Sequence, residues 1–343
     1  MCSIFGIIDH ENRMEHFLKE SLIQNLAIAA EIRGTDATGI SYVQDGSIKV
    51  CKEPKAAHEI NLRFPKGTKV IMGHTRMTTQ GSETKNWNNH PFEGCCGQEE
   101  FALAHNGMLW NDKELRKEEH LPPTCIETDS YIAVQLLERS SELNMENVKS
   151  MAEAIQGSFM ITVLRNDNTL FLVRGDNPIT MYYIPALGIY AYASTIQILN
   201  DALKETGLEY CERNEVRINS EEIVAISEDS FVREDFTQKY SYSRYNRYNS
   251  GYGYYDYYEH GCYGWSLNDG DDDVPATAKE VTSITDLLYE YGSMYNVSKE
   301  EIDILLEFGY TSDDIEDMFM DHSLLDAALS EVLSYVQGGL VNV

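Results

Sequence analysis

The second residue of the chain, Cys2, stands where a thiol could serve as an amino-terminal nucleophile. Removal of the initiator methionine, which the small size of cysteine permits, would leave a chain that begins with this thiol. The freed α-amino group would have a pKa of about 7.7–8.0, so a useful fraction would be neutral near pH 7 and able to accept the thiol proton. One residue would then supply both nucleophile and general base, as is known for amino-terminal threonine. A cysteine at this position can also be accidental, so the interpretation depends on the rest of the chain.

Five short motifs rich in Arg, Asp, Asn, His and Gly follow Cys2. In order they are residues 33–40 (RGTDATGI), 73–81 (GHTRMTTQG), 89–92 (NHPF), 105–111 (HNGMLWN) and 127–130 (ETDS). Together with residues 2–6 (CSIFG), this order resembles class II glutamine amidotransferase domains, which belong to the N-terminal-nucleophile hydrolase superfamily. Such domains include the glutaminase parts of glucosamine-6-phosphate synthase and amidophosphoribosyltransferase. The resemblance covers roughly residues 2–228, about two thirds of the chain.

The resemblance implies a catalytic role for three residues. Cys2 would attack the side-chain amide of glutamine, release ammonia and form a glutamyl thioester that water hydrolyses. The side-chain amide of Asn106 and the backbone N–H of Gly107 would form the oxyanion hole. Loss of one such donor costs on the order of 2.7–4 kcal/mol in other enzymes. Without the other motifs, Asn106-Gly107 would simply be a strong turn signal that ends a strand.

The resemblance also implies that three residues bind the amino-acid part of glutamine. Arg76 would hold the α-carboxylate, because a planar guanidinium donates two parallel hydrogen bonds and a lysine does not. Asp129 would pair with the α-ammonium, and Thr79 would add a hydroxyl contact at the carboxylate end. Simple amides should therefore be poor substrates. In isolation, Arg76 and Asp129 would instead be taken for a surface ion pair.

Other residues of the motifs are expected to support the active-site loops and not to contact the substrate. These are Arg33 and Asp36, which follow the first long helix, and His90 in the NHPF motif. His74 and His105 lie in the same set of motifs. The long spacing between the three histidines argues against a metal site. We expect neither a metal nor another cofactor.

A polar segment at residues 81–88 begins with glycine and follows Arg76 closely. By resemblance it forms a mobile loop that closes over glutamine, which suits its composition. The chain departs from many relatives at Met77, where they carry an aromatic residue, and at Gln80, where some carry histidine. These changes leave the chemical groups in place but affect the packing of the loop and its coupling to an acceptor site.

The pattern of apolar residues predicts the elements that must position these groups. Residues 3–8 form a buried apolar run typical of a strand, and residues 14–33 carry apolar positions at helical spacing that stops at Gly34. Two more helices are expected over 128–140 and near 196–205. Further strands are expected at 38–43, 47–51, 69–74, 101–105, 158–164, 169–174, 180–184, 187–193 and 222–227. This mixture without strict βαβ alternation favours an α+β fold, which the resemblance makes a four-layer αββα sandwich.

The composition limits the possible functions. The 343 residues include 27 Lys and Arg against 56 Asp and Glu, a formal net charge of −29. Such acidity argues against binding to a nucleic-acid backbone or an anionic membrane surface. No apolar run approaches the ~20 residues that span a bilayer, and the start lacks the features of a signal peptide, so we expect a cytoplasmic protein. Seven irregularly spaced cysteines, including adjacent Cys95 and Cys96, indicate neither a disulfide framework nor a zinc site.

The amidotransferase-like domain is expected to span residues 1–230. Residues 231–278 are rich in Tyr, Gly, Ser, Asn and Asp, a composition typical of a flexible linker, although the alternating Arg and Tyr could also stack on single-stranded bases. Residues 279–343 recover a helical period, and capping-box patterns begin at Ser298 and Ser323. We expect a small acidic helical bundle here, which weakly resembles a ubiquitin-associated domain or serves as a general docking module.

The resulting hypothesis is a glutamine-hydrolysing enzyme, the glutaminase half of an amidotransferase, with L-glutamine as substrate. Residues 231–343 carry no sugar-isomerase, phosphoribosyl or nucleotide-binding pattern, so we expect the ammonia-accepting synthase to be another chain that docks on the helical bundle. The net charge of −16 in this region suits a basic partner. The alternatives are a catalytically silent scaffold that acts as a protein-interaction module, and a hydrolase for another amide. Retention of Met1 would favour the scaffold, because it blocks the only obvious base.

Overall fold

The computed structural model describes residues 2–238 and, nearer the carboxyl end, Tyr289, residues 297–308, Tyr310, Ile315, Met318, Leu324, Leu325, Ala328 and Leu329. The chain divides into two compact units, Met1–Tyr257 and Tyr258–Val343. In the described part of both units, no helix combines the length and the apolar character needed to cross a lipid bilayer.

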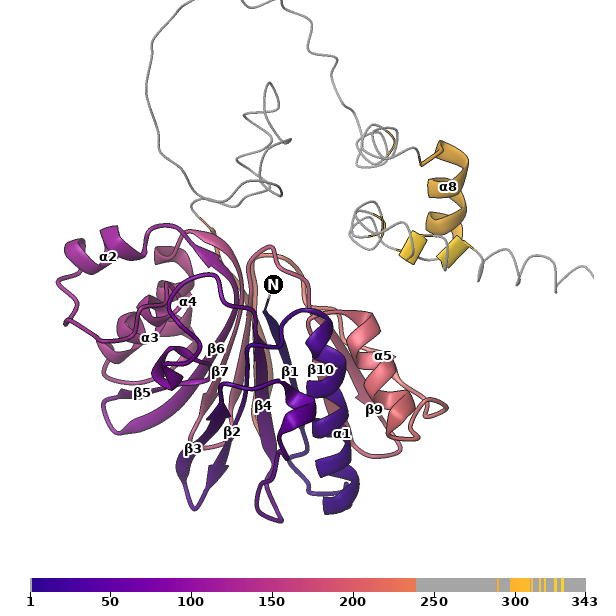
Figure 1. Ribbon diagram of the computed structural model, residues 1–343, viewed down its shortest axis with the longest axis horizontal. Coiled ribbons are helices and arrows are strands. Elements are labelled where there is room, and N and C mark those ends of the chain that lie inside the picture. Colours follow the sequence, from indigo (N-terminus) through magenta and orange to yellow (C-terminus); the bar gives the residue numbers. More distant parts are fainter. Residues whose placement is uncertain are drawn as a thin grey trace, which may run out of the picture. The chain divides into compact units, whose positions relative to one another are not determined.

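Two antiparallel sheets form the centre of the first unit (Figure 1). The first sheet has seven strands in the order β11-β9-β10-β1-β4-β2-β3. Their bounds are β1 Ser3–Ile8, β2 Ala37–Gln44, β3 Ser47–Glu53, β4 Val70–Arg76, β9 Thr180–Ile184, β10 Ile189–Ala193 and β11 Asn214–Glu215. The amino-terminal strand β1 therefore lies in the middle of this sheet, paired with β4 on one side and β10 on the other.

The second sheet has six strands in the order β13-β12-β8-β7-β6-β5. Their bounds are β5 Phe92–Cys96, β6 Glu99–Leu109, β7 Gly157–Arg165, β8 Leu170–Arg174, β12 Glu222–Ile226 and β13 Phe231–Asp235. The helices of the first unit are α1 His16–Ala29, α2 Asp112–Glu118, α3 Tyr131–Glu138, α4 Met145–Ala154 and α5 Ile196–Glu205, with short 3-10 turns η1 Ala30–Ile32, η2 Ala57–Glu59 and η3 Asn86–Asn88.

Three apolar cores bind these elements into layers. One core joins α1 and α5 to the first sheet, through residues such as Leu22 and Phe5. A second joins α3 and α4 to the second sheet, and a third, which includes Ile4 and Met160, fills the space between the two sheets. The alternation of side chains along each strand explains this arrangement, because successive residues face opposite sides of a sheet. The two antiparallel sheets confirm the expected α+β class, and Figure 1 shows helices on both outer faces.

The sequence-based prediction was wrong about where one strand ends. We expected the strand over 101–105 to end in a turn at Asn106-Gly107, but β6 continues to Leu109 and pairs with β7 throughout, up to Leu109 opposite Gly157. The positive φ of Gly107, +143°, lets the chain change its local twist without reversing direction. The helix expected over 128–140 begins later, at Tyr131, because residues 128–130 form the turn that leads into it.

The second sheet also extends past residue 230, where we expected the linker to begin. Strand β13 pairs with β12 from Phe231 opposite Ile226 to Asp235 opposite Glu222. Beyond it, Phe236 is buried and the side chain of Gln238 donates a hydrogen bond to the carbonyl of Gly157. The sequence missed this strand because it is short and its side chains are mostly exposed, so no apolar alternation marks it.

In the second unit one helix is described along its whole length, α8 Lys299–Phe308. Ser298 and Glu301 cap its start reciprocally: the backbone N–H of Ser298 donates to the carboxylate of Glu301 at 2.8 Å, and the backbone N–H of Glu301 donates to Oγ of Ser298 at 3.2 Å. This is the capping box expected from the sequence. The second capping box, at Ser323, and the linker over 239–278 lie outside the described residues.

Candidate active site

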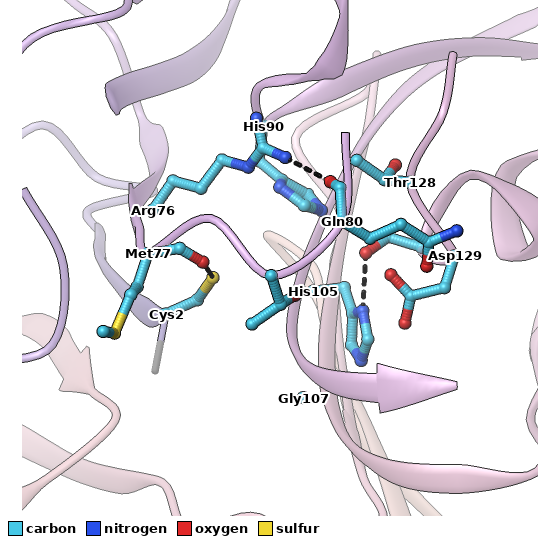
Figure 2. Close-up of a pocket in the computed structure, with 11 residues that line it drawn as sticks. Cys2, Arg76, Met77, Gln80, His90, His105, Gly107, Thr128 and Asp129 are labelled. Atoms are coloured by element: carbon cyan, nitrogen blue, oxygen red, sulfur yellow. Dashed lines mark hydrogen bonds between the residues drawn. The ribbon is translucent and has the colours of Figure 1, made fainter. Parts of the chain in front are cut away.

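A narrow pocket lies where the start of β1, the end of β4 and the end of β6 meet the turn before α3 (Figure 2). Its free space is about 10 Å³, room for about one water molecule. Its lining consists of Cys2, Arg76, Met77, Thr79, Gln80, His90, His105, Gly107, Thr128, Asp129 and Ser130. The structure therefore brings together all the residues expected to act in catalysis or glutamine binding except Asn106, which is buried and not part of the lining.

Cys2 is half-buried at one side of the pocket, directly before β1. Its backbone carbonyl accepts a 3.0 Å hydrogen bond from Nε of Arg33, so Arg33 positions the main chain of this residue. The thiol donates a long hydrogen bond, 3.5 Å, to the carbonyl oxygen of Met77 (Figure 2). Burial raises the pKa of the thiol, against the opposing effects of the Met77 carbonyl and the charge of Arg76. A thiol with a raised pKa is protonated near pH 7 and needs a base before it can act as a nucleophile.

Arg76 is buried at the end of β4, and its guanidinium binds the loop that follows it. Nη1 donates to Oδ1 of Asn89 at 2.6 Å, and Nη2 donates to the carbonyls of Gln80 at 2.6 Å and Gly81 at 3.3 Å. Burial lowers the pKa of Arg76, but a guanidinium stays protonated at ordinary pH. Within the described residues Nε makes no hydrogen bond, so part of the donor fork is available to an anion in the pocket.

Asp36 fixes the start of the loop after Arg76. Its backbone N–H donates to the carbonyl of Arg76 at 2.9 Å, and its Oδ2 accepts a 2.6 Å hydrogen bond from the backbone N–H of Thr78. Thr79 and Gln80 come next, with exposed side chains that line the pocket. Asp36 thus acts on the pocket through the backbone that carries Thr79.

Glu127 fixes the other end of this loop. Its carboxylate accepts from Nδ2 of Asn88 at 2.8 Å and forms an ion pair with Lys85 at 2.6 Å, while its backbone N–H donates to Oδ1 of Asn88 at 2.9 Å. In addition, Nδ2 of Asn88 donates to the carbonyl of Ser82 at 3.1 Å. Glu127 is two residues before Asp129. The contacts of Glu127 therefore connect the loop to the turn that carries the Asp129 carboxylate.

Asp129 presents a carboxylate to the pocket from the turn before α3. Its Oδ2 accepts a 2.6 Å hydrogen bond from the backbone N–H of Leu109, which holds the side chain against the end of β6. No hydrogen bond to Oδ1 is found in the described part of the chain, so this oxygen is available to a cation. Oγ of Ser130 lies 2.8 Å from Nδ1 of His105, which ties the same turn to β6 a second time (Figure 2).

The backbone at Gly107 adopts a conformation that favours glycine. Its φ is +143°, and a Cβ atom there would lie 1.9 Å from the carbonyl oxygen of Ser158 on β7. Since φ is near −140° in a regular antiparallel strand, the peptide group between Asn106 and Gly107 is rotated relative to its neighbours. The carbonyl of that group accepts a 2.8 Å hydrogen bond from Nδ2 of Asn177. The side-chain Nδ2 of Asn106 makes only a long contact, 3.4 Å, with Oγ of Ser194.

Three buried histidines form one wall of the pocket and the layer behind it. The rings of His74 and His90 are 4.2 Å apart between centroids, and Nε2 of His74 lies 3.1 Å from the carbonyl oxygen of His105. Burial lowers the pKa of all three side chains, that of His74 to about 3, and the nearby charge of Arg76 adds to the effect at His74 and His90. In the described part of the chain, no three His, Cys, Asp or Glu side chains are arranged to hold a metal ion.

Acidification is expected to destabilise the domain through these histidines. In the unfolded chain each takes up a proton near pH 6.5, whereas the folded protein holds each neutral below that pH. The unfolded state then binds more protons, so the free energy of unfolding falls as the pH drops below about 6.5. We expect urea titrations to show this fall in the free energy of unfolding between pH 7.5 and pH 5.5, of at most about 4 kcal/mol from the three groups, since a group that stays neutral in the folded protein contributes about 1.4 kcal/mol per pH unit below its unfolded pKa.

A pair of histidine variants checks this origin. His90→Leu removes one of the three groups and should reduce the pH dependence by up to about 1.4 kcal/mol per pH unit. His58 is exposed beside Glu31, which raises its pKa, so its contribution has the opposite sign. His58→Gln should therefore leave the fall in the free energy of unfolding at low pH unchanged or make it steeper. A pH dependence that His90→Leu does not change would contradict the explanation.

Several contacts of the site involve residues that the sequence did not single out. Asn89 accepts the hydrogen bond from Arg76, and Oγ of Ser194 accepts a 2.8 Å hydrogen bond from the backbone N–H of Ile4 on β1. Asn89 lies inside the NHPF motif, so its sequence position carried a signal. Ser194 and Asn177 lie in segments with no recognisable pattern, and only the three-dimensional structure reveals them.

Comparison with families of known proteins gives a match over residues 74–201, to the glutamine amidotransferase domain family. Two curated relatives are about 30% identical to parts of the chain. The 7-cyano-7-deazaguanine synthase of Sulfolobus acidocaldarius is 31% identical over 206 residues, which are 57% of this chain and 43% of that protein. The glutamine–fructose-6-phosphate aminotransferase of Sulfurisphaera tokodaii is 30% identical over 190 residues, 52% of this chain and 31% of that protein.

A glutamine–fructose-6-phosphate aminotransferase of Staphylococcus aureus is 29% identical over 248 residues, which are 68% of this chain and 37% of that protein. The chain thus spans less than half the length of the curated relatives it matches. Among solved structures, the glutamine phosphoribosylpyrophosphate amidotransferase of B. subtilis aligns with a TM-score of 0.53 and 20% identity, over 69% of this chain and 49% of that one. An allosteric regulatory enzyme of purine biosynthesis aligns with a TM-score of 0.55 and 19% identity, over the same shares.

At these identities the two solved structures show that this chain shares their fold. The family match identifies the domain type as a glutamine amidotransferase domain. The proteins that carry such domains are enzymes. The chain therefore matches the glutamine amidotransferase domain family over residues 74–201, within a unit whose fold it shares with a solved amidotransferase.

Proposed function

We propose that the chain hydrolyses the side-chain amide of L-glutamine to ammonia and glutamate, through a thioester on Cys2. The observation that carries the proposal is the pocket in which a thiol, a buried guanidinium and a buried carboxylate converge with the rotated peptide of Gly107. A thiol alone would suit many reactions. A cation and an anion beside it suit a substrate that carries both an α-carboxylate and an α-ammonium.

The proposed chemistry begins once Met1 has been removed. The α-amino group of Cys2 accepts the thiol proton, and the sulfur attacks the side-chain carbonyl carbon of glutamine. The negative charge that develops on oxygen is stabilised by the backbone N–H of Gly107 and the side-chain amide of Asn106. The proton then passes to the leaving nitrogen, the C–N bond breaks and ammonia departs. A water molecule, deprotonated by the same amine, hydrolyses the thioester and restores the thiol.

Recognition of glutamine in this proposal depends on Arg76 and Asp129. Nε of Arg76 and the unpaired Oδ1 of Asp129 offer a donor and an acceptor to opposite ends of the amino-acid head. The free space in the pocket holds about one water molecule, so glutamine requires the segment of Thr79 and Gln80 to move. During this movement Arg76 exchanges the carbonyls of Gln80 and Gly81 for the α-carboxylate of the substrate.

Arg76→Lys is expected to raise KM for glutamine by about 10- to 100-fold and to lower kcat much less. Lysine keeps the charge but loses the bidentate geometry, and it also loses the contacts that hold the loop. Steady-state kinetics with glutamine would measure both constants. Arg165→Lys is a matched control, because Arg165 binds Asp167 and the carbonyl of Leu143 far along β7 from the pocket. A large fall in kcat with unchanged KM would show that Arg76 supports the thioester chemistry and not substrate binding.

The relatives differ in what their names say they make, so the use of the ammonia is a separate proposal. We infer that an ammonia-accepting synthase binds to the carboxyl-terminal region of this chain. The support is the net charge of −16 over residues 231–343, which favours a basic partner by electrostatic attraction. The competing idea, a silent scaffold, is not favoured by a pocket that keeps a thiol, a guanidinium and a carboxylate together.

The decisive experiment combines intact-mass analysis with product measurement. We expect the mature chain to begin at Cys2 and to form glutamate and ammonia in equal amounts from glutamine. Simple amides that lack the α-amino and α-carboxyl groups should be poor substrates. No hydrolysis by a chain shown to begin at Cys2 would favour the scaffold, and equal turnover of a simple amide would favour a hydrolase of another class. Full activity with Met1 retained would exclude the proposed base.

A further inference from the structure

The peptide group between Asn106 and Gly107 is held from outside the pocket by the side chain of Asn177. This residue lies in the turn between β8 and β9 and does not line the pocket. Its Nδ2 donates a 2.8 Å hydrogen bond to the carbonyl oxygen of Asn106. That carbonyl and the N–H of Gly107 are the two ends of one rigid peptide plane, so a bond at one end fixes the direction of the other.

The amide of Asn177 is itself held in one orientation. Oγ of Ser158 on β7 donates to Oδ1 of Asn177 at 3.0 Å, which directs Nδ2 towards Asn106. The turn is anchored as well: Nε of Arg174 donates to the carbonyl of Asn177 at 3.2 Å, and Oδ1 of Asp176 accepts from the backbone N–H of Phe159 at 3.0 Å. Asn177 is therefore a fixed donor and not a mobile surface side chain.

We propose that Asn177 is a positioning residue of the oxyanion hole, an inference that rests on the proposed function. It keeps the rotated peptide in place, so that the N–H of Gly107 is aligned before the oxyanion forms. A carbonyl that accepts a hydrogen bond also polarises its peptide group and makes the N–H at the other end a better donor. Preorganised donors of this kind act on the transition state and not on the bound substrate, so the effect falls on kcat.

The test is a comparison of kcat and KM for glutamine in full-length variants. Asn177→Leu keeps the size of the side chain and removes the donor, and we expect kcat to fall about 10- to 100-fold with KM changed less than about twofold. Asn177→Asp replaces the donor with an acceptor that faces the carbonyl of Asn106, and its kcat should be at least as low. A fall with Asp alone would point to the added charge and would overturn the proposal, as would unchanged kcat in both variants.

Asn166 offers a matched control in the neighbouring turn, between β7 and β8. Its Nδ2 also donates to a backbone carbonyl, that of Gly46 at 3.1 Å, but it has no connection to the pocket. Asn166→Leu should change neither kcat nor KM. If Asn177→Leu fails to fold, Ser158→Ala still tests the proposal. It leaves Asn177 in place but frees its amide to rotate, so kcat should fall about 3- to 10-fold at constant KM, and an unchanged kcat would overturn the inference.

Failure of this inference is distinguishable from failure of the proposed function. If the unmodified chain beginning at Cys2 does not hydrolyse glutamine, the proposed function is wrong whatever Asn177 does. If it does hydrolyse glutamine and the Asn177 variants raise KM and leave kcat intact, the function stands, and Asn177 supports substrate binding instead of the oxyanion hole.

Discussion

Replacement of Cys2 by alanine is expected to lower the rate of glutamine hydrolysis by at least about 10⁴-fold, the scale on which loss of a covalent nucleophile acts in other hydrolases. Cys2 carries the only thiol that lines the pocket, and no other lining group can form a thioester. Since the side chain is half-buried and donates one long hydrogen bond, the variant should fold normally. Production of ammonia from glutamine would be followed in both proteins.

Covalent labelling provides the control for this prediction. A chloroketone analogue of glutamine should alkylate Cys2 once, with loss of HCl, and peptide mapping should find no label on the exposed Cys51 or Cys95. Cys51→Ala should retain full activity and full labelling. Turnover by Cys2→Ala close to that of the unmodified chain would exclude the thioester mechanism.

Gly107→Ala is expected to lower kcat by about 10²- to 10³-fold, as far as loss of an oxyanion donor does elsewhere. The new Cβ would lie 1.9 Å from the carbonyl oxygen of Ser158, a backbone atom of β7 that cannot move aside cheaply. The peptide must then rotate away from φ +143°, and the N–H of Gly107 turns with it. Thermal unfolding should also show a loss of stability of about 1–3 kcal/mol from the strain.

A second glycine separates strain from function. Gly67 has φ +90°, but a Cβ there would meet no atom within 4 Å. Gly67→Ala should therefore cost stability by strain alone and leave kcat unchanged. If Gly107→Ala retained normal kcat while losing stability, the oxyanion hole would have to be formed without this peptide.

Several elements followed from the sequence where burial imposed a clear pattern, although helix α4, with buried Val148, Met151 and Ala152, was not expected. Residues 3–8 and 196–205 coincide with β1 and α5, because both segments are anchored by side chains in the core. Strand β5 and helix α2 were missed. Each shows few buried side chains, Phe92 and Cys96 in the former and Leu115 in the latter, so neither has the periodicity on which such a prediction depends.

The sequence predicted most of the residues that line the pocket. It did not predict the hydrogen bonds that keep these residues in position. Cys2, Arg76 and Asp129 come from separate segments, and only the family resemblance joined them before the structure did. The contacts of Asn177 and Ser194 could not be anticipated, because a side-chain amide or hydroxyl that binds a distant backbone atom leaves no local pattern. The same holds for the three histidines, whose low pKa values arise from burial between layers.

Strand β13 has a consequence for how the folded domain avoids self-association. Among the residues that the structure describes, it is the outermost strand of the second sheet, and its mostly exposed side chains include Arg233, Glu234 and Asp235. Charged residues on an edge strand discourage the backbone pairing by which sheets of separate molecules aggregate. A chain that ended at residue 230 would lose this strand and present β12, whose side chains are buried throughout, as the new edge. Shortened forms of the protein should thus retain residues up to 238, or they will tend to associate through the bare backbone of β12.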